Sequence, residues 1–103
     1  MKIIPISKKW STFTKDNVSF TQDGYGVYEL GDTKGEVHYI GQGRINPRLN
    51  SHFVSESHPI PGTKSFRHEY TSSQERAEQR ERALLQSYER QHGKLPKYNH
   101  KIG

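Results

Sequence analysis

The stretch from residue 73 to residue 92 most constrains the fold, because it has the pattern of one long amphipathic helix. Ser72 and Glu75 are spaced as a capping box at its start, and Gly93 followed by Pro96 marks its end. Its apolar residues recur at the spacing that places side chains on one stripe of a helix, namely Ala77, Leu84, Leu85 and Tyr88.

An acidic residue, Glu81, lies on this same stripe, four residues after Ala77 and three before Leu84. The other acids of the segment lie on the flanks of the stripe or off it, and they are Glu75, Glu78 and Glu89. Burying a lone carboxylate costs several kcal/mol unless it gains a cation or a metal as partner. Glu81 is therefore a candidate metal ligand. The alternative is that it lies at the edge of the stripe and pairs with one of the nearby arginines.

Three short segments rich in aromatic and β-branched residues predict strands. Residues 25–30 and 36–40 flank a turn at residues 31–35, which is the pattern of a β-hairpin, and the Gly-rich residues 41–43 are expected to end its second strand. Residues 65–71 predict a third strand.

A short helix is expected after the hairpin. Asn46 is a favourable N-cap residue and Pro47 suits the first helical position, so the helix would run from there to about Phe53. Leu49 and Phe53, four residues apart, would face the core. Residues 54–64 carry Ser, Pro, Gly and His and predict a loop.

The length of 103 residues predicts one domain, residues 1–103, with one modest core. Residues 1–23 are a polar lead with scattered apolar anchors, ahead of a core at residues 24–103. These residues would pack either as an arm or as a short edge strand, and their residue pattern does not distinguish the two.

Charge and composition point to a polyanionic partner. Lys and Arg number 16 against 11 Asp and Glu, a formal net charge of +5, which favours nucleic acid, although a basic domain without such a partner is about as frequent. The chain has no cysteine, so disulfides and thiolate metal sites are excluded. No segment has the roughly 20 apolar residues that span a bilayer, and a cytoplasmic protein without membrane contact is expected.

Five short motifs, in order, resemble those of the GIY-YIG nuclease superfamily. Gly26–Tyr28 and, ten residues later, Tyr39–Gly41 resemble the two-part signature, with Val in the middle of the first half. Arg48–His52 is similar to the Arg-x-x-x-His helix of the family, Glu81–Leu85 to the segment with its acid, and Pro96–Asn99 to its closing Pro-x-x-Asn. The resemblance spans residues 24–99. It implies an α+β fold with a small three-stranded, mainly antiparallel sheet flanked by helices.

The resemblance also implies a hydrolytic chemistry that uses one metal ion. Glu81 would be the sole protein ligand of Mg²⁺, with Mn²⁺ as a substitute, and the remaining ligands would be water and phosphate oxygens. The 18 residues from Glu81 to Asn99 are a longer spacing than in the shortest family members, and Glu78 is the alternative acid.

The same resemblance assigns roles to five more side chains. Tyr28 would take a proton from water, and Tyr39 would orient water or phosphate. Arg48 would clamp the scissile phosphate, since its planar fork matches phosphate oxygens. His52 would share the proton transfer or bind phosphate, and Asn99 would hold the site closed through a backbone or side-chain bond.

Grip on DNA is expected from contacts with the phosphate backbone rather than from base reading, because no helix-turn-helix or zinc-finger pattern is present. Specificity would then be low, directed by DNA structure, or supplied by a partner protein or a second copy of the chain. The cations expected along such a phosphate track are Arg44, Arg48, Lys64, Arg67, Lys94, Lys97 and Lys101.

The sequence thus predicts a metal-dependent endonuclease acting on single- or double-stranded DNA. Two alternatives use the same fold without catalysis: a nucleic-acid-binding module, or an accessory protein that binds another protein. The joint presence of Tyr28, Tyr39, Arg48, Glu81 and Asn99 favours the enzyme, because binding alone would not require Glu81.

Overall fold

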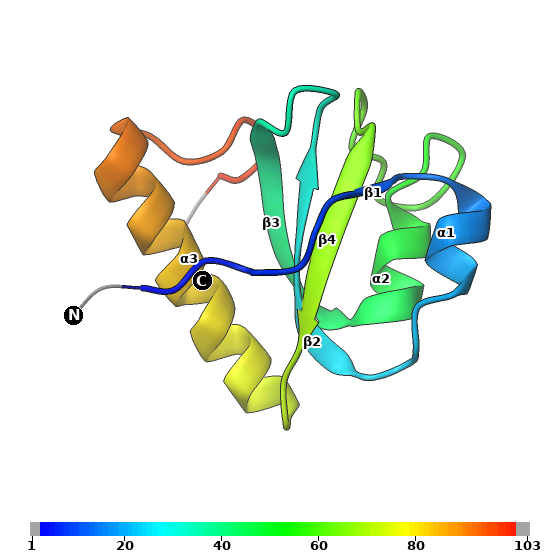
Figure 1. The fold of residues 1–103 in the computed structure, drawn as a ribbon, viewed down its shortest axis with the longest axis horizontal. Coiled ribbons are helices and arrows are strands. Elements are labelled where there is room, and N and C mark those ends of the chain that lie inside the picture. The colour runs from blue at the N-terminus through cyan, green and yellow to red at the C-terminus, as the bar shows by residue number, and fades with distance from the viewer. Residues whose placement is uncertain (1–2, 101–103) are drawn as a thin grey trace.

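A computed structural model describes residues 3–100, which form an antiparallel sheet with helices on both faces (Figure 1). The strand order is β1-β4-β2-β3. The strands are β1 Ser11–Thr12, β2 Tyr25–Gly31, β3 Val37–Arg44 and β4 Ser65–Tyr70, and the helices are α1 Lys15–Ser19, α2 Ile45–Ser51 and α3 Gln74–His92. The predicted fold class is confirmed, with a fourth strand, β1, added to the expected three. Lys101 lies outside the described residues.

The predicted hairpin forms from β2 and β3, but its second strand does not end at residues 41–43. Pairing continues through Tyr28 with Gly41 and Gly26 with Gly43, as far as Tyr25 with Arg44. The glycines were expected to terminate the strand, yet the ladder continues through both of them. At Gly41 a neighbouring side chain occupies the space that a β carbon would take.

That neighbouring side chain is the ring of Tyr28, which lies across β3 at Gly41. A β carbon on Gly41 would lie 2.4 Å from both Cζ and the hydroxyl oxygen of Tyr28, closer than van der Waals contact permits. Tyr28 is itself fully buried, as are Val27 and Leu30 on the same strand. The absence of a side chain at Gly41 therefore allows a residue of central strand β2 to reach the outer edge of the sheet.

Helix α2 begins at Ile45, one residue before the predicted N-cap Asn46. The Asn46 side chain instead donates to the carbonyl oxygen of Val18 at 3.1 Å and to Oγ1 of Thr21 at 3.1 Å, which ties α2 to the segment around α1. Asn46 therefore lies inside the helix, where its Nδ2 makes tertiary contacts and its Oδ1 accepts from Nδ2 of Asn50 at 3.3 Å, and it caps no backbone N–H. The helix also ends at Ser51, before the predicted Phe53.

Helix α3 matches the predicted helix within one residue. Its N-cap is Ser73, whose hydroxyl accepts from the backbone N–H of Arg76 at 3.1 Å, so the predicted capping box from Ser72 is wrong by one position. Gly93 ends the helix in the left-handed conformation, as predicted. The apolar stripe is buried against β2 and β3, and its buried residues are Ala77, Leu84 and Leu85.

The N-terminal lead forms both an edge strand and an unpredicted short helix. Strand β1 pairs with β4, and α1 follows it with Thr14 as N-cap. Before β1, Ile6 is buried in the cluster beneath α3, and Trp10 packs its ring over the guanidinium of Arg67. The lead therefore crosses the sheet in front of β4 (Figure 1).

No helix among residues 3–100 is both long and apolar enough to cross a membrane.

We expect Gly41→Ala to lower the free energy of unfolding by about 1–3 kcal/mol, because the new methyl group overlaps the Tyr28 ring. Urea unfolding monitored by circular dichroism measures the effect. The control is a double-mutant cycle with Tyr28→Leu, which removes the ring. An unchanged cost of Gly41→Ala in the Tyr28→Leu background would show that the overlap is not its cause.

Candidate active site

Side chains from four segments converge beside the outer edge of β3. Tyr28 comes from β2, Tyr39 from β3, Arg48 from α2, and His52 from the residue that caps α2. The ring centroids of Tyr28 and Tyr39 are 6.2 Å apart, and the His52 ring lies 5.5 Å from Tyr28 and 5.2 Å from Tyr39. Glu81 on α3 is close enough to influence the charge state of both tyrosines. Of the six predicted catalytic residues, Tyr28, Tyr39, Arg48 and His52 are thus brought together, and Glu81 lies within electrostatic range of them.

A short hydrogen bond of 2.6 Å joins the Tyr28 hydroxyl to Nε2 of His52, and both side chains are buried. The other ring nitrogen of His52, Nδ1, lies 2.7 Å from the carbonyl oxygen of His58. A carbonyl can only accept, so Nδ1 carries the proton and Nε2 of the neutral ring accepts. The Tyr28 O–H therefore donates to His52. Burial lowers the pKa of His52 below its usual 6.5, with nearby Arg48 acting in the same direction.

The two phenols are held in their protonated form. Burial raises the pKa of Tyr28 well above its usual value, with a further increase from Tyr39, and Arg48 opposes the change only in part. Burial also raises the pKa of the half-buried Tyr39, and Arg48 again opposes it. Neither hydroxyl ionises by itself near neutral pH, so proton transfer through Tyr28 requires an acceptor, and His52 is hydrogen-bonded in that position.

Arg48 is half-buried and has an unmet hydrogen-bonding group. Its Nε is enclosed and has no partner among the described residues. Burial lowers the pKa of Arg48, but the Tyr28 and Tyr39 phenols outweigh it and the pKa is raised overall, so the cation is retained. Gly43, with φ at +132°, brings the backbone of β3 against the Arg48 side chain, and a β carbon there would lie 3.1 Å from its Cγ. An enclosed guanidinium with a free N–H is suited to an anion.

Glu81 is half-buried on α3, and burial raises the pKa of its carboxyl, while Arg48 and Arg82 lower it. Neither arginine is paired with it: no cationic nitrogen of the described residues lies within 4.0 Å of its oxygens. The predicted alternative, an ion pair between Glu81 and a nearby arginine, is therefore not formed among residues 3–100. Glu78, the alternative acid, is exposed.

The Asn99 side chain makes two hydrogen bonds to the backbone at the free edge of β3. Its Oδ1 accepts from the backbone N–H of Ile40 at 2.9 Å, and its Nδ2 donates to the carbonyl oxygen of the same residue at 2.9 Å. The backbone N–H of Tyr98 donates to the carbonyl of His38 at 2.9 Å. Residues 98 and 99 thus satisfy the outer edge of β3 beside Tyr39. Of the two roles predicted for Asn99, the backbone bond is the one observed.

A cleft of about 520 Å³ opens beside Arg48, and Tyr25, Gln42 and Pro47 are among the residues that line it. Gln42 was not predicted as a site residue. Its Oε1 is enclosed and has no donor among the described residues. The sequence does carry a signal for it, since strand alternation places Gln42 on the same face as Ile40, towards α3, where a polar residue is unexpected.

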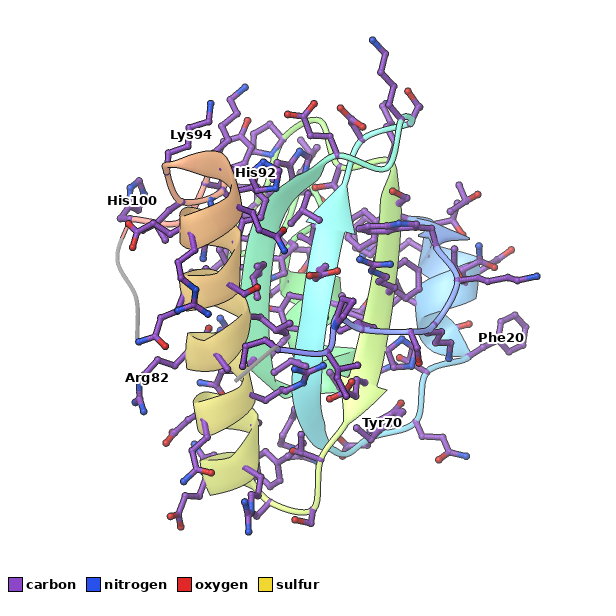
Figure 2. The ribbon with its side chains drawn as sticks, turned by 60° about the vertical axis from the view of Figure 1, so that its left-hand side comes forward. Phe20, Tyr70, Arg82, His92, Lys94 and His100 are labelled. Carbon is purple, nitrogen blue, oxygen red and sulfur yellow. The ribbon has the colours of Figure 1, made fainter. Side chains whose placement is uncertain are left out.

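The predicted phosphate-binding cations fall into separate groups. Arg44 is paired with Asp23, and Arg67 donates to Glu29 at 2.6 Å beneath Trp10, so both guanidinium groups are engaged by the protein itself. Lys64 is exposed just before β4. Lys94 and Lys97 line a different cleft of about 640 Å³ past the C-terminal end of α3, where Figure 2 shows Lys94. Arg44 lines the same cleft as Arg48, whereas Lys94 and Lys97 share the other one.

Comparison with known proteins identifies a family and a fold. The model of a family described as a domain of unknown function (DUF7508) matches residues 4–91. The GIY-YIG N-terminal endonuclease domain of UvrC from Thermotoga maritima, bound to its catalytic magnesium, is a similar solved structure with a TM-score of 0.67 and 21% identity, covering 84% of this chain and 94% of that chain.

A point mutant of the same Thermotoga maritima domain, bound to its catalytic divalent cation, has a TM-score of 0.68 and 20% identity over the same shares of the two chains. No curated protein matches this chain in sequence. At these identities the likeness shows the fold alone. The GIY-YIG-like fold predicted from the five motifs is therefore confirmed.

We expect Asn99→Ala to speed hydrogen exchange at the Ile40 amide about tenfold or more, because that N–H loses its acceptor. The Glu29 amide on central strand β2 is the internal reference, and NMR exchange measures both. Asn99→Asp, which retains an acceptor but not the donor, should give a smaller change. An equal increase in the exchange rates of the Ile40 and Glu29 amides would indicate global destabilisation rather than loss of the local hydrogen bond.

Proposed function

This chain belongs to the family described as a domain of unknown function (DUF7508), and from its GIY-YIG fold and its own side chains we propose that it is a metal-dependent endonuclease that hydrolyses phosphodiester bonds of DNA. The observation that carries the proposal is the Arg48 guanidinium, enclosed beside two phenols and Glu81 with an unpartnered Nε. Because Arg48 lines the cleft of about 520 Å³, a phosphate group in that cleft can accept hydrogen bonds from its guanidinium.

The residues at the site fit a magnesium ion held by one carboxylate. Residues 3–100 contain no group of three or more His, Asp or Glu side chains that could enclose a metal. Glu81 is a partly buried carboxylate without an ion-pair partner there. Mg²⁺ commonly uses one or two carboxylates and keeps several waters. When bound, the ion would lower the pKa of water and stabilise charge on the phosphoryl group.

The proton of the attacking water would pass through Tyr28 to His52. The Tyr28 oxygen accepts the water proton as its own proton moves along the 2.6 Å hydrogen bond to Nε2 of His52. His52 can receive it because its ring is neutral and its Nδ1–H is fixed by the His58 carbonyl. This route avoids a free tyrosinate, which burial disfavours.

Arg48 and Tyr39 would position the phosphate. Arg48 lines the cleft at the outer edge of β3, where its charge would stabilise the negative charge that develops on the phosphoryl oxygens. Tyr39 lies beside both Tyr28 and His52 and keeps its hydroxyl proton, so it can donate to a phosphate oxygen. Asn99 would act indirectly, by fixing the edge of β3 next to Tyr39.

Glu81→Ala is expected to reduce cleavage of plasmid and linear DNA by more than about a hundredfold in Mg²⁺ or Mn²⁺, because the sole carboxylate ligand is lost. Gel assays with and without a chelator measure this. The matched control is Glu78→Ala, an exposed acid on the same helix that should retain full rate. Cutting that persists in Glu81→Ala would refute the metal assignment. No cutting by the unaltered chain would favour the binding-module alternative.

The pH dependence tests the proton route. Because His52 must be neutral to accept a proton and its pKa is lowered, the acidic decline of the rate should have its midpoint below pH 6.5. Single-turnover rates across pH measure the profile. His52→Gln should lose about a hundredfold in rate, and an acidic decline that remains in this variant belongs to the Glu81 carboxyl, which must be ionised to hold the metal. A decline of the unaltered chain with its midpoint above 6.5, or an unchanged rate in His52→Gln, would exclude His52 as acceptor.

A further inference from the structure

A second cleft lies at the opposite edge of the sheet from Arg48. It has a volume of about 360 Å³ and lies between the N-terminal lead, α1 and β4, with Lys8, Ser11, Phe20, His68 and Tyr70 among its lining residues. Among the described residues that line it, none is acidic. The cleft therefore combines a cation and neutral polar groups with aromatic rings.

His68 leaves an unmet polar group in the wall of this cleft. The side chain is only 7% exposed, its Nε2 lies 3.3 Å from Nζ of Lys8, and its Nδ1 has no partner among the described residues. An ammonium has no acceptor, so Nε2 accepts and the neutral ring carries its proton on Nδ1. Burial, helped by the charge of Lys8, lowers the pKa of His68 to about 4. The cleft thus has the charged Lys8 as a donor beside a neutral, buried imidazole.

Two aromatic rings stand at the mouth of the cleft. Phe20, the residue that caps α1, is 83% exposed and projects into solvent in Figure 2. Tyr70 is 41% exposed, and its hydroxyl donates to the carbonyl oxygen of Gln22 at 2.7 Å, which fixes the ring against the chain near Gly24. An exposed aromatic ring at a cleft that also carries a lysine suits the stacking of a nucleobase.

The cleft is close to the proposed cleavage site along the chain. Gln22 lines it, while Tyr25, three residues later, lines the cleft beside Arg48. Three extended residues span at most about 10 Å. The nearby acid Asp23 is paired with Arg44, so its charge is compensated. A strand of nucleic acid leaving the Arg48 cleft can therefore reach the second cleft around the end of the sheet.

We propose that this second cleft binds an unpaired nucleotide of the DNA substrate, with its phosphate on Lys8 and its base stacked on the exposed ring of Phe20. The substrate would then be DNA with a single-stranded segment next to the cleavage position. A paired base is already stacked in its duplex and cannot use this ring, which is why the cleft selects single strands. The position of the cut in this inference rests on the proposed function, whereas nucleotide binding in the cleft does not depend on it.

Binding is measured by fluorescence anisotropy with the full chain and a chelator present, so that cleavage plays no part. The probes are a blunt duplex and the same duplex carrying a single-stranded arm. Phe20→Ala should weaken binding of the armed duplex about tenfold and leave the blunt duplex unchanged. Ile4→Ala is the matched control, since Ile4 is 74% exposed and does not line this cleft.

Lys8→Met should lower the slope of log affinity against log salt for the armed duplex by about one, because one phosphate contact is lost. Lys34→Met, an exposed lysine in the β2–β3 turn that does not line this cleft, should leave the slope unchanged. Circular dichroism of Phe20→Ala and Lys8→Met checks that each variant folds.

The possible results separate this inference from the proposed function. If Phe20→Ala loses the binding that depends on the arm, and the unaltered chain cleaves no DNA, nucleotide binding in the cleft is supported and the proposed endonuclease activity is refuted. If cleavage depends on Glu81, but Phe20→Ala binds each probe as tightly as the unaltered chain does, nucleotide binding in the cleft is refuted and the proposed activity is not. The exposed rings would then belong to a contact with another protein.

Discussion

The placement of the Tyr28 ring over Gly41 is the contact on which the site depends. A residue of the central strand would ordinarily point into the core beneath its own strand, and here the bare backbone of β3 lets the ring extend to the sheet's outer edge. There it meets His52 through a 2.6 Å hydrogen bond and lies beside Tyr39. The two glycine-containing motifs are thus one packing unit, in which the second makes room for the tyrosine of the first.

The free edge of β3 explains how helices on opposite faces contribute to one site. Tyr28 and Tyr39 face α2, whereas α3 packs on the other face and carries Glu81. Only beyond the last strand can side chains from both layers meet without crossing the sheet. An exposed strand edge also invites pairing with another chain, and Asn99 prevents this by binding both polar groups of Ile40. The same contact therefore protects the edge and delimits the site.

The sequence positions of the charged residues do not show which of them are paired within the protein and which are available to a partner. Arg67 and Arg44 stabilise the protein through Glu29 and Asp23, which leaves the net charge of +5 to act through other groups. The lead is an example, since it carries Lys8 to a cleft without acidic lining residues at the far edge of the sheet. A basic composition indicates a polyanionic partner, but only side-chain pairing shows which cations are available to it.

The sequence by itself determined the long helix, the hairpin and the order of the five motifs, because helical periodicity, strand propensity and turn residues act over a few neighbouring positions. It also singled out Glu81, since a carboxylate on an apolar stripe is visible without a fold. The tertiary structure decided what depends on distant neighbours. Asn46 lies inside α2 and bonds to Val18, β3 continues past Gly41, where the Tyr28 ring takes the place of a side chain, and Gln42 lines the Arg48 cleft. Hydrogen bonds and packing between remote segments outweigh local preference there, and no local pattern records them.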